Sequence, residues 1–399
     1  MSTDALVGPT RGGDWDDNGV WRQIHTQTWA PDHGEVRGAW NSLLSNIYKC
    51  NLVIENGGTT AQVIEARFLR AWYYYNVVDL FGQAPYRPAG SSLLEDPKVW
   101  SRAEATDFII TELEAVVGTL PNRTANDASI ANKDAARFLL AKVYLNKAVF
   151  TSENPAGPYT FDAADMTKVV QNVDAITNTL ATNYWDNFAP ANNTSSEIIF
   201  SSKNVTGGPG GNMQSKWRMG THYNQTPSSW NGFVTLSQFY DSFEGNDVRK
   251  SDTLAGYTNR VGPTAGLIVG QARGPVKPGS PKEPGSIGDP IGNLFDRSGN
   301  PLVFTRNASI FFNGEASGIR VNKFPLNPAE INGGGWGSAN EFPFFRFSDV
   351  RLMKAEALLR GGTAGANGET ALSIVNDLRS KRRATALGSV TLTSLLAER

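Results

Sequence analysis

The chain has little of the chemistry that enzymes and redox proteins use. Its only cysteine is Cys50, which excludes an internal disulfide and any paired-cysteine metal or redox motif. The three histidines are His25, His33 and His222, and the sequence contains no HExxH, nucleophile-elbow, P-loop or Rossmann glycine pattern. The sequence therefore predicts a protein that is not an enzyme, with no catalytic residue, no metal site and no cofactor.

An excess of one charge and a long apolar run are also missing. Lysine and arginine number 37 against 38 acidic residues, which gives a net charge of −1. This balance provides no electrostatic footprint for nucleic acid or for an acidic membrane surface. No apolar run reaches the ~20 residues that span a bilayer, and the N-terminus lacks the charged-then-apolar pattern of a signal sequence. We expect either a cytosolic protein or a chain that begins after such a segment.

The stretch 59–85 predicts a central helix. Thr59 and Gln62 have the spacing of a capping box, and Gly82 and Pro85 are typical of a helix end. Between these ends the helix is apolar or aromatic around most of its girth, as a helix packed on several sides must be. We therefore expect its neighbours to be helices too.

A short pattern in this helix recurs further along the chain. The residues ARFL-x-A begin at Ala66 and again at Ala136. We interpret this offset of 70 residues as two units of about 35, close to the ~34-residue tetratricopeptide period. The sequence thus predicts a mostly α fold, a tetratricopeptide-like array of helix pairs.

Helical periodicity and turn residues divide the chain into four parts. Residues 1–34 are loop-rich, 35–183 form the helical repeat array, 184–343 form an irregular insert with short strands, and 344–399 form a closing helix pair. Beyond the central helix, we expect helices at 35–55, 101–120, 133–150, 165–180, 235–243, 345–360 and 368–383, and strands at 197–201 and 318–324. Since a solenoid must bury the exposed face of each pair, we expect the closing pair to stack on the array with the insert across one side.

Two acidic residues near the N-terminus have the spacing of calcium ligands. Asp14-x-Asp16-x-Asn18-Gly19 matches the first half of an EF-hand loop. However, the twelfth position is His25, where the motif requires a bidentate glutamate. We expect a solvated acidic turn, and a calcium ion near Asp14 remains an open alternative.

Six tryptophans fall in segments without periodicity, at positions 15, 21, 29, 217, 230 and 336. A loop tryptophan either anchors the loop or offers a flat, amphipathic ring to a ligand. Such rings suit sugars, because the apolar face of a pyranose stacks on them while polar neighbours bind its hydroxyls. The predicted ligand site uses as stacking platforms Trp15, Trp21, Trp230 and Trp336, with Tyr223 assisting, and as hydroxyl partners Asp14, Asp16 and Asn231.

Several motifs in order resemble the SusD/RagB family. They are PTRGGDWDDNGVWRQIHTQTW, EARFLRAWYYYNVVDLFGQAPY, NKDAARFLLAKVYLNKAVF, FPFFRFSDVRLMKAEALLR and VNDLRSKR. The resemblance implies a surface-exposed lipoprotein of the outer membrane that captures oligosaccharides or polysaccharides without catalysis. It also implies delivery of the ligand to a partnered SusC-like, TonB-dependent transporter, and an array of tetratricopeptide-like helix pairs that supports an irregular ligand-binding half.

The chain departs from the family's pattern at both ends. It lacks the N-terminal cysteine that carries lipid, so any membrane attachment depends on an anchor outside this sequence. It also stops where members continue into a further helix. Two alternatives to glycan capture stay open: a peptide-capturing member of the family, and a helical-repeat scaffold for other proteins.

Overall fold

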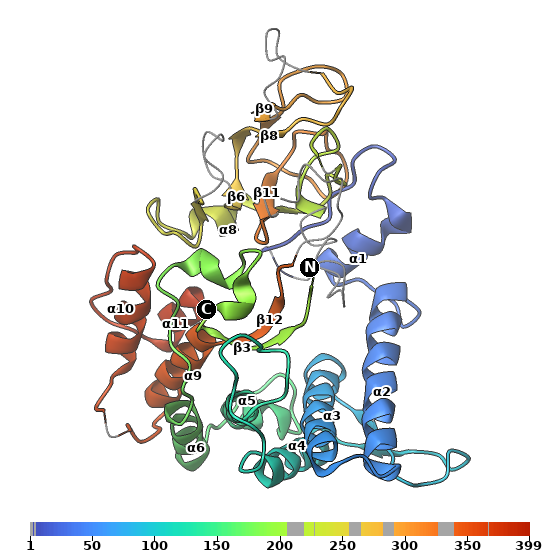
Figure 1. The fold of residues 1–399 in the computed structure, drawn as a ribbon, viewed down its shortest axis with the longest axis vertical. Helices are drawn as coiled ribbons and strands as arrows, with labels where there is room; N and C mark the ends of the chain where they lie inside the picture. The colour runs from blue at the N-terminus through green and yellow to red at the C-terminus, as the bar shows by residue number, and fades with distance from the viewer. Residues whose placement is uncertain are drawn as a thin grey trace.

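The computed structural model describes residue 3 and residues 5–205, 219–226, 228–254, 265–281, 291–325, 339–365 and 367–399. Helices gather in one half of the molecule, and the short strands and loops of the insert occupy the other half (Figure 1). The predicted fold class, mostly helical with short strands in loop-rich regions, is confirmed. Within the described ranges, none of the helices is both long and apolar enough to cross a bilayer.

The helical half is a row of helices that pack side by side. Its members are α2 (Gly34–Glu55), α3 (Thr60–Phe81), α4 (Arg102–Val116), α5 (Lys133–Phe150), α6 (Ala163–Asp174), α9 (Phe347–Leu359), α10 (Ala371–Lys381) and α11 (Leu392–Glu398). Each helix from α2 to α6 packs on the next one, and α9 then packs on α6, α5, α10 and α11. The closing helices therefore stack on the earlier array, as predicted.

The helix starts follow the local sequence signals. The Thr59 side chain accepts from the Gln62 N–H, and the Gln62 side chain accepts from the Thr59 N–H, which completes the capping box of α3. Ser101 and Glu104 do the same for α4. Each box satisfies two backbone donors that the first helical turn leaves without partners.

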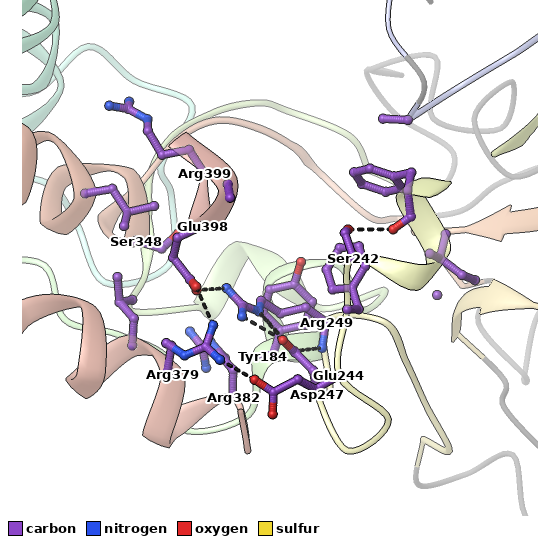
Figure 2. A pocket seen from close by; sticks show the side chains of 18 of the residues that line it. Tyr184, Ser242, Glu244, Asp247, Arg249, Ser348, Arg379, Arg382, Glu398 and Arg399 are labelled. Atoms are coloured by element: carbon purple, nitrogen blue, oxygen red, sulfur yellow. Dashed lines mark hydrogen bonds and ion pairs between the residues drawn. The ribbon is translucent and has the colours of Figure 1, made fainter. Parts of the chain in front are cut away.

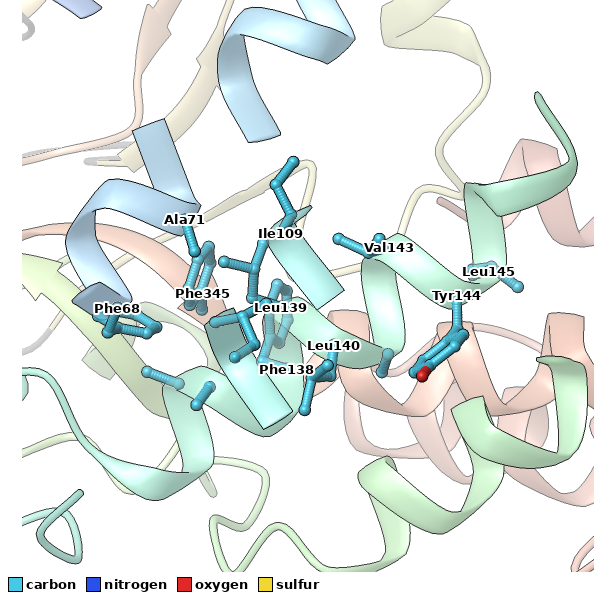
Figure 3. Close-up of a cluster of buried hydrophobic side chains, with 14 of the residues drawn as sticks. Phe68, Ala71, Ile109, Phe138, Leu139, Leu140, Val143, Tyr144, Leu145 and Phe345 are labelled. Atoms are coloured by element: carbon cyan, nitrogen blue, oxygen red, sulfur yellow. The ribbon is translucent and has the colours of Figure 1, made fainter. Parts of the chain in front are cut away.

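The repeated ARFL-x-A residues occupy equivalent places in the main core. Phe68 of α3 meets the Phe200 ring edge-on at 5.5 Å, and Phe138 of α5 stacks on Phe345 at 4.3 Å (Figure 3). However, only α4 lies between α3 and α5, together with a hairpin and two loops. The offset of 70 residues therefore spans one helix pair with long connections, and its interpretation as two tetratricopeptide units was wrong.

The strands are short and pair antiparallel, mostly within the insert. β1 (Ala84–Tyr86) pairs with β2 (Lys98–Trp100) beside the array, and β3 (Ile198–Ser202) pairs with β12 (Phe342–Arg346). A four-stranded sheet has the order β4 (Val234–Thr235), β11 (Ile319–Asn322), β6 (Ala265–Ile268) and β5 (Ser251–Asp252). Two further pairs in the described residues are β7 (Gly270–Gln271) with β10 (Val303–Phe304), and β8 (Arg273–Pro275) with β9 (Ile291–Asn293).

The structure corrects the prediction for α6. This helix ends at Asp174 rather than near residue 180. The carboxylate of Asp134 accepts hydrogen bonds from the Thr177 N–H at 3.2 Å and hydroxyl at 2.7 Å, and the Asn178 amide donates to the Ser196 carbonyl at 2.9 Å. These side-chain bonds replace the hydrogen bonds that a longer helix would make.

Part of the predicted N-terminal loop is helical. A 3-10 turn η1 (Asp17–Gly19) leads into α1 (Val20–Thr26), and the insert contributes α8 (Ser237–Asp241) with two further 3-10 turns, η2 (Tyr184–Asn187) and η3 (Asn192–Thr194). Left-handed residues bound α1, with φ values of 80° at Gly19 and 56° at Gln27. A helix of seven residues is too short to show a periodic pattern in the sequence.

A buried ion cluster ties the insert to the closing helices. Glu197, just before β3, is fully buried and pairs with Arg382 at 2.7 Å and with Arg346 at 2.9 Å. Burial raises the pKa of Glu197, but the two guanidinium groups outweigh that effect and hold this pKa below its usual range. Removing either arginine would leave the buried Glu197 carboxylate with only one cationic partner, which is costly. The cluster therefore holds the insert firmly against the closing helices.

Candidate functional site

Three of the four predicted tryptophan platforms lie together, although they come from distant parts of the chain. We call Trp15, Trp21, Trp230 and Phe233 the aromatic cluster. The ring centre of Trp15 lies 6.0 Å from Trp21, 6.5 Å from Trp230 and 5.1 Å from Phe233. The Trp15 indole N–H also donates to the Trp230 carbonyl at 2.8 Å. The fourth predicted platform, Trp336, lies outside the described residues, as does Trp217.

The N-terminal segment reaches the cluster by pairing with the insert. Val7 and Val234 exchange backbone hydrogen bonds of 2.7 and 2.9 Å, and Arg11 and Asp14 close a tight turn with bonds of 2.8 and 2.9 Å. This turn puts Trp15 in the left-handed region, at φ 61°. Its ring then covers residue 232, where a Cβ would lie only 2.5 Å from the Trp15 Cε2. A glycine at position 232 is therefore what allows the ring this close.

Two buried arginines stabilise the backbone next to the aromatic cluster. The Arg11 guanidinium donates to the carbonyls of Gly314 at 2.6 Å and Ser317 at 2.9 Å, and burial lowers its pKa to about 10. Arg320 donates to the Ser317 carbonyl at 2.7 Å and to the Asn231 side-chain oxygen at 2.7 Å. Carbonyl oxygens rather than carboxylates accept the hydrogen bonds of these two guanidinium groups, which fixes the backbone that carries the aromatic rings.

Asn231 does not fit the predicted role of a hydroxyl partner. Its side chain is fully buried, and its oxygen accepts from Arg320. Its amide donates to the Glu315 carbonyl at 3.1 Å. Because both ends of the amide bind protein groups, Asn231 stabilises the backbone of the site and does not face a ligand.

A polar network lies beside the aromatic cluster. The Tyr223 hydroxyl donates to the Asp14 carboxylate at 2.7 Å, and the Arg297 guanidinium lies 4.4 Å from the centre of the Tyr223 ring. Arg297 also contacts Asp14 at 3.4 Å and forms an ion pair with Glu315. The side chains of Asp14 and Arg297 are 46% and 55% exposed, so their polar edges face solvent next to the rings.

His222 completes this network on its buried side. Its Nε2 lies 3.1 Å from Glu315, and its Nδ1 accepts the Asn224 N–H at 3.2 Å. An accepting Nδ1 carries no proton, so the imidazole is neutral. Burial lowers the pKa of His222 to about 4, although the Glu315 carboxylate opposes this shift.

Asp16 directly follows Trp15 in the chain and pairs with Arg22 at 2.5 Å. The Trp21 indole N–H donates to Asp17 at 2.6 Å. The Asp16 side chain remains 45% exposed. Across the ranges that the structure describes, no three acidic, histidine or cysteine side chains are grouped as a metal would require. The half-motif of an EF-hand here forms the turn that leads into α1.

A cavity of 560 Å³ lies elsewhere, between the insert and the closing helices (Figure 2). Several of its charged lining groups pair with one another: Arg249 contacts Asp247 at 2.6 Å and Glu398 at 2.5 Å, and Arg379 contacts Glu398 at 2.7 Å. No residue of the aromatic cluster lines this cavity. We favour the aromatic cluster as the ligand site, because three of its rings are only half-buried and the side chains of Asp14, Asp16 and Arg297 beside them are about half exposed.

Sequence reasoning missed several members of the site. Phe233 follows Trp230 closely and shares its apolar character, so a wider search around each loop tryptophan would have included it. Arg297, Glu315 and His222 gave no such signal, because each stands alone in an irregular stretch.

Comparison with known proteins shows the family to which this chain belongs. Residues 170–391 match the SusD family, and residues 11–145 match a family described as "Starch-binding associating with outer membrane". The chain therefore belongs to the SusD family.

Particular relatives are similar over parts of the chain. The starch-binding protein SusD of Bacteroides thetaiotaomicron is 28% identical over 195 residues, which are 46% of this chain and 34% of that protein. SusD-like protein P2 of Formosa agariphila is 29% identical over 149 residues, which are 35% of this chain and 29% of that protein. The matched stretches thus span about a third of the length of these curated relatives.

Solved structures share the whole fold at low identity. A SusD superfamily protein from Parabacteroides distasonis has a TM-score of 0.72 at 18% identity, over 99% of this chain and 76% of that one. A structure solved with a xylogluco-oligosaccharide has a TM-score of 0.71 at 20% identity, covering 99% of this chain and 73% of that one. A laminarin-binding SusD-like protein has a TM-score of 0.69 at 17% identity, covering 100% and 81%. These matches confirm the SusD-like fold.

Proposed function

We propose that this protein binds an oligosaccharide or polysaccharide at the aromatic cluster without catalysing a reaction. The observation that carries the proposal is the convergence of Trp15, Trp21 and Trp230 beside the exposed polar edges of Asp14 and Arg297. The names of its relatives, which include a starch-binding protein and a laminarin-binding protein, support the same class of ligand.

The members of the site divide into an anchor and platforms. Trp15 is fixed by its hydrogen bond to Trp230 and by its close contact with Gly232, so it serves as the anchor. Trp21 and Trp230 are half-buried beside it and offer ring surface to a pyranose. Apolar ring faces combined with a polar tip give contact area at low entropic cost, as in other aromatic-rich binding surfaces.

The exposed charges around the rings suit sugar hydroxyls. Asp14 and Asp16 accept hydrogen bonds and Arg297 donates them, and bonds to charged groups are stronger than bonds between neutral ones. The Tyr223 hydroxyl is already bound to Asp14, so Tyr223 acts mainly by positioning that carboxylate. Trp336 stays a predicted platform.

We further propose that the protein acts at the outer-membrane surface and delivers its ligand to a SusC-like, TonB-dependent transporter. The description of the family matched by residues 11–145 supports the location. Attachment would be through an N-terminal lipid. Fractionation of cells that express the protein natively, together with co-purification of a transporter, tests both parts.

Titration calorimetry over a panel of neutral polysaccharides and peptides tests the ligand class. For a glycan that binds, Trp21→Ala and Trp230→Ala should each cost on the order of 1–3 kcal/mol, about 5- to 150-fold in affinity. Trp29→Ala is the matched control, because Trp29 is 42% exposed and lies outside the aromatic cluster. Binding of peptides but of no glycan would refute the proposal and favour the peptide-capturing alternative.

A further inference from the structure

Two neighbouring phenylalanines near the site are exposed to solvent. Phe311 is 53% exposed and Phe312 is 89% exposed, and their ring centres lie 6.5 Å apart. Burying one phenylalanine side chain stabilises a protein by about 1.5–3 kcal/mol. The structure forgoes nearly all of that gain at Phe312 and about half of it at Phe311, which is consistent with a contact outside the fold.

The loop that carries this pair is held in place. The Thr10 N–H donates to the Ile310 carbonyl at 3.4 Å, and the Asn313 amide donates to the Thr10 carbonyl at 3.0 Å. The Asn313 side-chain oxygen accepts the Ser309 N–H at 2.9 Å. These bonds tie the loop to the N-terminal segment, so the two rings are positioned before any ligand arrives.

Arg22 joins the phenylalanine pair to the aromatic cluster. Its guanidinium lies 5.6 Å from the centre of the Phe311 ring and bonds to Asp16 and to the Thr10 hydroxyl, both at 2.5 Å. Arg22 directly follows Trp21, which belongs to the cluster. The exposed pair therefore continues the same surface past Trp21 rather than forming a separate one.

We propose that Phe311 and Phe312 form a second stacking platform for the same glycan, so that the site selects chains long enough to reach both platforms. This inference rests on the proposed function and adds a preference for chain length. Arg22 and Asp16, which lie between the platforms, would bind hydroxyls of the intervening sugars.

The size and surroundings of the pair favour a sugar over a protein partner. With roughly 150–250 Å² per phenylalanine, the two exposed fractions give about 300 Å² of ring surface. A stable protein interface needs about 800 Å² on each side, with a largely apolar centre. The near neighbours of the pair are Ser309 and Asn313, which form a polar rim suited to hydroxyl groups.

The experiment uses the glycan that the calorimetric panel identifies. Measuring the affinity of the protein for a series of chain lengths of that glycan tests the inference. Wild-type affinity should rise with length, and Phe312→Ala should lower affinity about 10-fold for the longest chains while leaving the shortest bound chain unchanged. Trp21→Ala should lower affinity at every length. Leu94→Ala is the matched control for loss of an exposed apolar side chain, because Leu94 is 97% exposed outside this surface.

The possible failures are distinguishable. If the wild-type protein binds no glycan, the proposed function is wrong. If Phe312→Ala and the double variant Phe311→Ala/Phe312→Ala bind every chain length like the wild type, only the second platform is wrong. Loss of association with outer-membrane vesicles, with glycan binding intact, would overturn the inference in favour of protein docking. Unchanged circular dichroism and melting curves would show that the variants are folded.

Discussion

Adding one methyl group at Gly232 should dismantle the aromatic cluster. An alanine Cβ at this position would lie 2.5 Å from the Cε2 of Trp15 and 2.8 Å from its Cη2. Carbon atoms in contact are ordinarily about 3.5–4.0 Å apart, so the indole must move by about 1 Å. A shift of this size breaks the alignment of its N–H with the Trp230 carbonyl and disturbs the packing against Trp21.

The expected magnitude follows from overpacking in a well-filled site. Such insertions typically cost about 1–3 kcal/mol. We expect Gly232→Ala to lower the apparent melting temperature and to reduce glycan affinity by at least about 10-fold, since about 1.4 kcal/mol corresponds to a factor of ten. Differential scanning calorimetry and isothermal titration measure the two effects separately.

Two further variants isolate the cause. Gly118→Ala adds the same methyl group where nothing lies within 4 Å, so it should leave stability and binding unchanged. In the background Trp15→Ala, the second change Gly232→Ala should cost much less, because the clashing ring is absent; such a double-mutant cycle measures the coupling directly. If Gly232→Ala melts and binds like the wild type, Trp15 does not lie on Gly232 and this account of the site is wrong.

Three other predictions concern stability. Phe138→Ala should cost about 3–5 kcal/mol in chemical denaturation, since Phe138 is fully buried, and should leave the glycan affinity of the folded protein unchanged. Because burial lowers the pKa of His222 to about 4, below the 6.5 of an unfolded histidine, its neutral ring stabilises the fold fully above pH 6.5. That stabilisation should be lost as the pH falls toward 4, and His222→Gln should flatten this part of the melting-temperature profile. Arg382→Met should cost about 3–5 kcal/mol because it leaves Glu197 buried with one partner fewer, whereas Lys381→Met, at an exposed position, should change the denaturation midpoint little.

The helical half could be predicted because its signals are local. The capping residues Thr59 and Ser101 fix where α3 and α4 begin. Helical periodicity that extends over 22 and 15 residues identifies both elements as helices. The end of α6 could not be predicted, since it depends on Asp134, which lies 43 residues from Thr177 in the chain. Contacts at that separation leave no mark on the sequence pattern.

The candidate site was predictable in its chemistry and not in its geometry. Loop tryptophans are rare enough to be noticed one by one. However, Trp15 and Trp230 are 215 residues apart, and no sequence signal in either segment indicates that the two are in contact. The strands that bring them together are two to four residues long, too short for an alternating pattern. Asn231 was misjudged because its neighbours suggested an exposed loop, whereas Arg320 draws its side chain inward.

The return of α9 to the face of α6 has a consequence for how the protein folds as it is made. The ion pair between Asp174 and Lys354 joins residues 180 positions apart. At roughly 5–20 residues per second, synthesis takes about 10–35 s to cover that distance. Throughout this time the first five array helices can assemble, but the apolar side of α6 has no cover. We therefore expect the packing of α6 to be completed only after α9 has been made.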